Sequence, residues 1–116
     1  RPIGDFQAVA HPLADCSMRL SAAASLARAA AFYFDAGGAA QARHFAAAAH
    51  VSAIDASLEA AYVCHQVFGA IGITREGPIF HLSRRVRQLA SQVPSRAASR
   101  NQLLAEAGFS AAGASR

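Results

Sequence analysis

The 116-residue sequence has few of the residues that build β-sheets. Valine and isoleucine are scarce and scattered, whereas strands are enriched in these β-branched residues and in aromatics. Only two tyrosines, seven phenylalanines and no tryptophan are present. Alanine, the best helix former, makes up more than a quarter of the residues. The composition therefore predicts an all-α protein.

Lysine is absent, so the positive charge comes entirely from arginine. The formal net charge of +4 could indicate a nucleic-acid partner. The arginines are spread along the chain, however, apart from Arg84, Arg85 and Arg87, and no aromatic residues alternate with them. There is also no apolar run of transmembrane length and no signal-peptide pattern. We therefore expect a cytoplasmic protein that binds neither nucleic acid nor membrane.

The sequence lacks the patterns of metal sites and of common hydrolases. Cys16 and Cys64 are its only cysteines and form no CxxC pair, so we expect free thiols that pack in the interior. The histidines form no HExxH motif, and His44 and His50 point to different faces of one helix. There is no GxSxG turn, and residues 69–72 lack the GK[ST] ending of a P-loop. We therefore predict no metal site.

Two long helices are predicted by apolar residues that recur at steps of three and four. The first covers about residues 6–36, with Asp5 as its N-cap and a stop at Gly37-Gly38. Pro12 lies about two turns inside this helix and predicts a kink or a later true start. The apolar stripe consists of Leu13, Cys16, Leu20, Ala23, Ala27, Ala30 and Phe34.

The second long helix covers about residues 40–68, and the glycine pair before it predicts an antiparallel hairpin. Asp55 and Glu59 lie one turn apart on one face, where like charges repel mildly. We favour two solvated acids there, and the alternative is a basic partner that faces them. The apolar stripe consists of Ala47, Val51, Ile54, Leu58, Ala61 and His65, with Leu58 predicted in the core.

A glycine-rich turn over residues 66–77 leads into two shorter helices. Pro78 can begin the third helix, and Pro94 ends it. Ser95 can cap a fourth helix that ends near Ala107. The third helix carries the apolar stripe Ile79, Leu82, Val86, Leu89 and Val93.

These elements predict a single domain over residues 1–116 with an all-α fold. We expect an antiparallel four-helix bundle in which two long helices precede two shorter ones. The sequence lacks an initial Met and begins with a loop-like segment. We therefore expect it to be a fragment of a longer chain.

Four segments of the sequence, taken in order, carry a family resemblance. Residues 1–9 (RPIGDFQAV), with His11 and Leu13-Ala14-Asp15, match an opening of the form "PI..FQAV.H.LAD". Residues 26–37 match the end of a first helix, and residues 66–76 (QVFGAIGITRE) match a "Q..GG.GFT.E" signature. Residues 82–86 (LSRRV) match a "Y.RRA" segment. Together these segments resemble the C-terminal helical domain of acyl-CoA dehydrogenases over nearly the whole chain.

The resemblance implies a domain of an enzyme that uses FAD to remove two hydrogens from the Cα and Cβ atoms of an acyl-CoA thioester. It also implies a homo- or hetero-oligomer, either a dimer or a tetramer. In the family the "FQ" and "Q..GG" segments contact FAD, the second typically from the neighbouring subunit. A side-chain amide and exposed backbone N–H groups suit a pyrophosphate or ribose. Carried over by position, the FAD-contacting residues are Phe6, Gln7, Gln66, Gly69 and Ala70.

Two positions depart from the family's pattern. The usual catalytic glutamate falls on Val93, which cannot abstract a proton, so we expect no catalytic residue in this chain and no activity from it alone. Ala70 replaces the second glycine of the signature. Some members of the family carry the base on the helix that precedes this domain. The alternative is a base-less, non-catalytic subunit, or a helical interaction module, that pairs with a catalytic partner.

Overall fold

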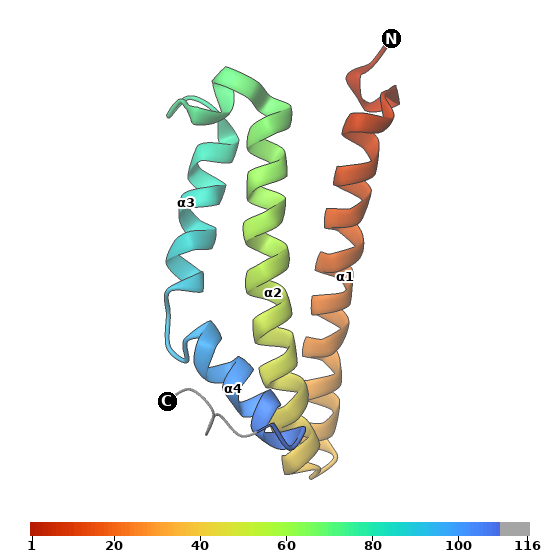
Figure 1. The fold of residues 1–116 in the computed structure, drawn as a ribbon, viewed down its shortest axis with the longest axis vertical. Helices are drawn as coiled ribbons and strands as arrows, with labels where there is room; N and C mark the ends of the chain where they lie inside the picture. Colours follow the sequence, from red (N-terminus) through yellow and green to blue (C-terminus); the bar gives the residue numbers. More distant parts are fainter. Residues whose placement is uncertain (110–116) are drawn as a thin grey trace.

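The computed structural model describes residues 1–109, and every regular element in that range is a helix. The long helices α1 (Gln7–Asp35) and α2 (Ala39–Phe68) are followed by the shorter α3 (Pro78–Ala90) and α4 (Arg96–Glu106). Two 3₁₀ segments, η1 (Ile3–Asp5) and η2 (Gly69–Ile73), precede α1 and α3. The prediction of an all-α fold, with two long helices before two shorter ones, is confirmed (Figure 1).

Helix α2 is the centre of the arrangement. Helix α1 packs antiparallel along one side of it, and α3 and α4 follow one another along the other side (Figure 1). The predicted stop at Gly37-Gly38 is confirmed, because α1 ends at Asp35 and Gly37 has φ 77°. That left-handed conformation favours glycine over every other residue. The glycine pair therefore produces the α1–α2 hairpin.

Three predicted helix ends need correction. Asp5 is not the N-cap of α1, because it belongs to η1 and Phe6 takes the cap position. A start after Pro12 is also wrong, since α1 begins at Gln7 and runs through this proline. Helix α3 ends at Ala90 rather than at Pro94. The Ser95 cap of α4 is confirmed, because its hydroxyl accepts a hydrogen bond from the Ala98 N–H at 3.1 Å.

The hydrophobic core is thin and consists mainly of alanine. Small side chains let α1 and α2 approach closely, but each buries little apolar area. No large side chain within residues 1–109 is fully buried. The buried apolar residues are Cys16, Ala23, Ala42, Ala47, Ala49, Ile54, Ala56, Ala61 and Ile79.

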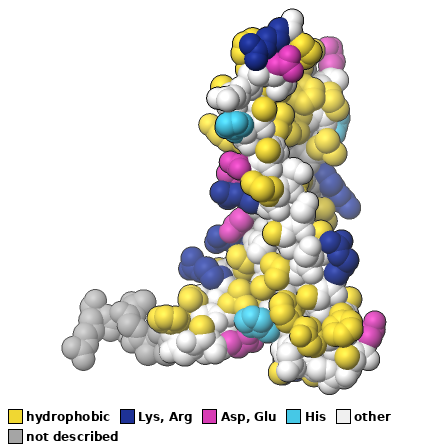
Figure 2. Space-filling model, turned by 90° about the vertical axis from the view of Figure 1, so that its right-hand side faces the viewer, with side chains coloured by type: hydrophobic (Ala, Val, Ile, Leu, Met, Phe, Trp, Pro, Cys, Tyr) yellow, Lys and Arg dark blue, Asp and Glu magenta, His cyan; other side chains and the backbone are white. Residues whose placement is uncertain are grey.

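Much of each predicted apolar stripe is exposed in this chain. Leu58 is 37% exposed, so placing it in the core was wrong. Phe34, at the end of the first stripe, is 77% exposed. Helix α3 turns Ile79 and Ser83 toward α2, which leaves several apolar side chains on its other faces. Figure 2, which views the molecule from the α1 side, shows apolar patches near both ends. The other exposed members of the stripes are Leu20, Ala27, Leu82, Leu89 and Val93.

Candidate functional site

The glycine-rich turn joins α2 to α3, and each of its glycines is favoured at its position for a different structural reason. Gly69 ends α2 with φ 60° and ψ −140°, a conformation that L side chains rarely adopt. A Cβ on Gly72 would lie 3.0 Å from the Cβ atom of Phe68. A Cβ on Gly77 would lie only 2.3 Å from the carbonyl oxygen of Ile71, which no relaxed backbone allows. The turn therefore depends on all three glycines for its own shape.

The five residues predicted to contact FAD lie at one end of the molecule. Phe6 and Gln7 are at the start of α1, and Gln66 lies in the last turn of α2, beside Gly69 and Ala70. Because α1 and α2 are antiparallel, both groups reach the same end of the hairpin (Figure 1). All five residues are exposed, and no hydrogen bond joins the two groups within residues 1–109.

The backbone of this turn is open to a ligand, but the N–H group of Gly69 is not a free hydrogen-bond donor. The Gly69 N–H already bonds to the carbonyl oxygens of His65 and Gln66. No heavy atom lies within 4 Å of the position that a Gly69 Cβ would occupy, so a ligand can approach the chain there. Ala70 adopts no positive φ and therefore fits its position without backbone strain. The exposed amides of Gln7 and Gln66 are the polar groups that an adenine dinucleotide could use.

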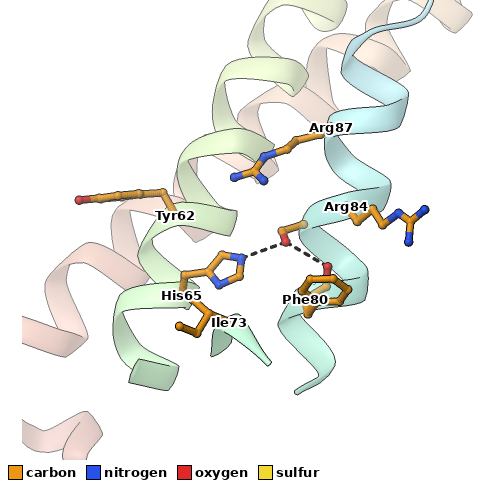
Figure 3. A pocket seen from close by; sticks show the side chains of 7 residues that line it. Tyr62, His65, Ile73, Phe80, Arg84 and Arg87 are labelled. Atoms are coloured by element: carbon orange, nitrogen blue, oxygen red, sulfur yellow. Dashed lines mark hydrogen bonds between the residues drawn. The ribbon is translucent and has the colours of Figure 1, made fainter. Parts of the chain in front are cut away.

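A cleft of about 450 Å³ lies beside the turn, between α2 and α3. The sequence did not single it out, because its lining is spread over α2, η2 and α3. The only sequence signal was a histidine on the apolar stripe of α2, opposite the arginine-rich third helix. The lining residues are Tyr62, His65, Ile73, Phe80, Ser83, Arg84 and Arg87 (Figure 3).

One hydrogen-bond chain crosses the wall of this cleft. The Ser83 hydroxyl donates to the Phe80 carbonyl oxygen at 3.1 Å, so it must accept from the Nε2–H of His65, 2.9 Å away (Figure 3). This network assigns the Nε2–H tautomer to a neutral His65. The Nδ1 atom is then an acceptor, and it is buried without a partner. Because Ser83 gives its proton to a carbonyl, the pair is not an activated nucleophile.

Both acids on α2 have basic partners, so the interpretation of two solvated carboxylates was wrong. Arg96 of α4 binds Asp55 through two hydrogen bonds of 2.5 and 2.7 Å, and Arg19 of α1 lies 2.6 Å from a Glu59 oxygen. The hydrogen bond from Arg96 is the main cause that lowers the pKa of Asp55. These pairs connect α2 with the helices on either side of it.

The cysteines and histidines form no metal site in the described residues. No group of three or more His, Cys, Asp or Glu side chains there could hold a metal ion. Cys16 is buried, and burial raises the pKa of its thiol, with a smaller contribution from Glu59. Cys64 is half-buried, and both thiols are free. Residues 1–109 also contain no helix that is long and apolar enough to span a membrane.

Val93, the residue predicted to stand at the position of the family's usual glutamate, lies outside any helix. Val93 is 96% exposed in the segment between α3 and α4, where its bond to Pro94 is cis. An isopropyl side chain can neither take nor give a proton. No acidic residue lies in α3 or in the segment that joins it to α4. The chain therefore offers no replacement base at this position.

Comparison with known proteins identifies a family. The family model described as "Acyl-CoA dehydrogenase, C-terminal domain" matches residues 1–91. This range contains both groups of predicted FAD-contacting residues and ends before Val93. No curated protein and no solved structure matches the chain. The matched region covers most of the 116 residues, so the chain belongs to the acyl-CoA dehydrogenase family as its C-terminal helical domain.

Proposed function

We propose that this chain is the FAD-contacting and oligomerisation domain of a flavin-dependent acyl-CoA dehydrogenase. The main support is the family match, which spans both the start of α1 and the glycine turn. Both segments lie at the same end of the hairpin, where Gln7 and Gln66 are exposed. The residues present fit the cofactor, because Gln7 and Gln66 expose amide groups at this end and the backbone position at Gly69 is open.

In this proposal the chain positions the cofactor and does not carry out the chemistry. Bound FAD would accept the β-hydrogen of the acyl-CoA as hydride. Gln7 and Gln66 would hold its polar parts, and Phe6 would offer an apolar ring. The open backbone position at Gly69 would let the cofactor approach the chain. The α-proton base would come from a helix before Arg1 in the longer enzyme, because Val93 cannot supply it.

The oligomerisation part of the proposal is supported by exposed apolar side chains. The described residues bury mostly alanine, whereas Phe32 and Phe34 are 66% and 77% exposed. Surfaces of this kind mark contacts with further protein. Either other domains of the longer chain or neighbouring subunits would cover them.

The proposal is tested in the full protein encoded by the gene that contains this chain. We expect that protein to carry the family's N-terminal and middle domains and to purify with a flavin absorption spectrum. Replacing Gln66 by Ala should reduce the FAD content, and Gln41→Ala at the opposite end of α2 is the matched control. A reading frame without those domains, or a flavin content that is unchanged by Gln66→Ala, would contradict the proposed role.

A second candidate is a base-less subunit that pairs with a catalytic partner, and it is favoured by Val93 alone. The two candidates differ in flavin reduction. If the full protein, purified without any partner, reduces its flavin when acyl-CoA is added, the second candidate is rejected. If reduction requires a co-purified partner subunit, the first candidate is rejected.

A further inference from the structure

We propose that the cleft between α2 and α3 binds a small organic anion, a carboxylate or a phosphate attached to an aromatic or branched apolar body. This site is separate from the proposed FAD contacts, because none of Phe6, Gln7, Gln66, Gly69 and Ala70 lines it. It is formed within this chain by α2, η2 and α3.

The first argument is uncompensated positive charge. Arg84 and Arg87 line the cleft, and Arg87 extends from α3 across it toward α2, whereas the Arg84 guanidinium points away (Figure 3). Helix α3 contains no acidic residue, and the only two acids of α2, Asp55 and Glu59, are already paired with arginines from other helices. No salt bridge within residues 1–109 involves Arg87.

The charge of Arg87 thus has no protein counter-ion on either wall of the cleft. A guanidinium offers a planar fork of N–H donors that matches the geometry of carboxylate and phosphate oxygens. An anion that enters between α2 and α3 would therefore meet a donor that is already directed across the cleft.

The second argument is the apolar part of the lining. Phe80 and Tyr62 provide aromatic rings, and Ile73 of η2 adds a branched aliphatic side chain. A volume of about 450 Å³ lies in the range of small-molecule pockets, which are lined mainly by apolar groups with a few polar ones. A bare inorganic ion would leave this apolar surface uncovered, so the ligand must carry an apolar body.

His65 and Ser83 form a polar wall of the cleft. Ser83 is only 3% exposed, and its hydroxyl donates to the Phe80 carbonyl oxygen and accepts from His65. The Nδ1 atom of His65 is buried and has no partner. Buried polar atoms are nearly always paired with protein, water or ligand. A buried acceptor offers no hydrogen bond to an anion, so this wall shapes the cleft, and the arginine fork supplies the donors.

The experiment titrates small anions into the 116-residue chain, and ¹⁵N-resolved NMR and calorimetry monitor their binding. The probes are phenyl phosphate and benzoate, with inorganic phosphate and benzyl alcohol as the charge-only and ring-only controls. We expect one of the two aromatic anions to bind at least about tenfold more tightly than either control, which corresponds to about 1.4 kcal/mol. The tighter of the two identifies the head group as phosphate or carboxylate.

Two arginine variants test whether the anion binds in the cleft between α2 and α3. Arg87→Gln should weaken binding of the preferred aromatic anion by about tenfold or more, since a hydrogen bond to a charged group contributes about 1.5–3 kcal/mol. Arg85→Gln is the matched control, because Arg85 lies on the same helix, bonds to Gln88 and does not line the cleft. Circular dichroism of both variants establishes that the helices are retained.

Three results would overturn the proposal. The first is no binding of either aromatic anion to the folded chain at millimolar concentration. The second is an equal loss of affinity in Arg87→Gln and Arg85→Gln, which would indicate attraction to the general positive charge. The third is a set of NMR shifts that excludes Tyr62, His65 and Phe80. If Arg87→Gln loses its helices, Tyr62→Leu replaces it, because Tyr62 is 66% exposed and lines the cleft.

Discussion

The Nε2 atom of His65 lies 2.9 Å from the Oγ atom of Ser83, and this hydrogen bond joins α2 to α3 beside the glycine turn. Replacing Ser83 by Ala would leave Nε2–H without an acceptor, while Nδ1 already has no partner. An unsatisfied buried donor costs about 1–3 kcal/mol. We expect Ser83→Ala to lower the free energy of unfolding by about that amount, measured by urea denaturation.

Ser91→Ala is the control for this experiment. The Ser91 hydroxyl also bonds to a carbonyl one turn earlier, that of Gln88, but it is exposed and joins no second helix. We expect a change within about 0.5 kcal/mol, as is usual for a surface position. Equal effects of the two substitutions would show that the bond to His65 contributes nothing to stability.

Gly77→Ala should damage the connection between η2 and α3. The added methyl group would meet the carbonyl oxygen of Ile71 at 2.3 Å, so the backbone of the turn has to move. Overpacking of this kind typically costs about 1–3 kcal/mol. Gly4→Ala is the matched control, since nothing lies within 4 Å of its Cβ position. Thermal denaturation that leaves the two variants indistinguishable would contradict the geometry of the turn.

The position of the turn could be predicted from sequence, but the reasons for its glycines could not. Three glycines and a proline over residues 69–78 are a local signal that the chain changes direction. That a Cβ on Gly77 would clash with Ile71 depends on how the turn folds back on itself. For the same reason the sequence did not show that the Gly69 N–H is already bonded within the helix end.

The ion pair between Asp55 and Arg96 should make stability depend on pH. In the folded chain the pKa of Asp55 lies below its ordinary value of 3.8, chiefly because Arg96 donates a hydrogen bond to the carboxylate. The pair therefore stabilises the fold fully above that ordinary value. Its contribution is lost as the pH falls through the lower folded-state pKa.

We expect Asp55→Asn to lose about 0.2–1 kcal/mol at neutral pH, a small amount because the two side chains are 41% and 46% exposed to solvent. The difference from wild type should shrink toward zero in acid below the folded-state pKa. Asp15→Asn is the control, since no salt bridge within residues 1–109 includes Asp15. Urea denaturation over a series of pH values measures the effect, and a pH-independent difference would contradict it.

Ile54 and Leu58 lie one turn apart on α2, and the structure separates their roles. Ile54 is 8% exposed, so Ile54→Ala should cost about 2–5 kcal/mol. Leu58 is 37% exposed, and its truncation should cost less than about 2 kcal/mol. Urea denaturation of the two alanine variants in parallel checks which one loses more stability. An equal loss of unfolding free energy would show that Leu58 belongs to the core.

Periodicity alone could not make this distinction. Steps of three and four placed Ile54 and Leu58 on one stripe, but α2 is contacted by α1, α3 and α4 along different parts of its length. Which members of the stripe are covered depends on where each neighbouring helix begins and ends. The pairing of Asp55 and Glu59 with arginines of α4 and α1 was hidden for the same reason, since the partners are 41 and 40 residues away.

The exposed rings at the Gly-Gly end of the hairpin should drive association of the isolated chain. Phe32 and Phe34 are 66% and 77% exposed, and an apolar cleft lined by Phe34 and several alanines lies beside them. We therefore expect light scattering to show a dimer or larger species whose fraction rises with concentration. A chain that stays monomeric at high concentration would contradict this expectation.

Phe34→Gln tests whether that end of the hairpin is the associating surface. The ring contributes little to the core because most of it is already exposed, so the substitution should leave the midpoint of thermal unfolding of the monomer nearly unchanged. It should shift the light-scattering mass toward that of the monomer, since burial of an aromatic ring is a main source of interface free energy. Arg43→Gln alters a polar residue of the same cleft and should have a smaller effect. If Arg43→Gln dissociates the chain and Phe34→Gln does not, then charge and not apolar burial holds the copies together.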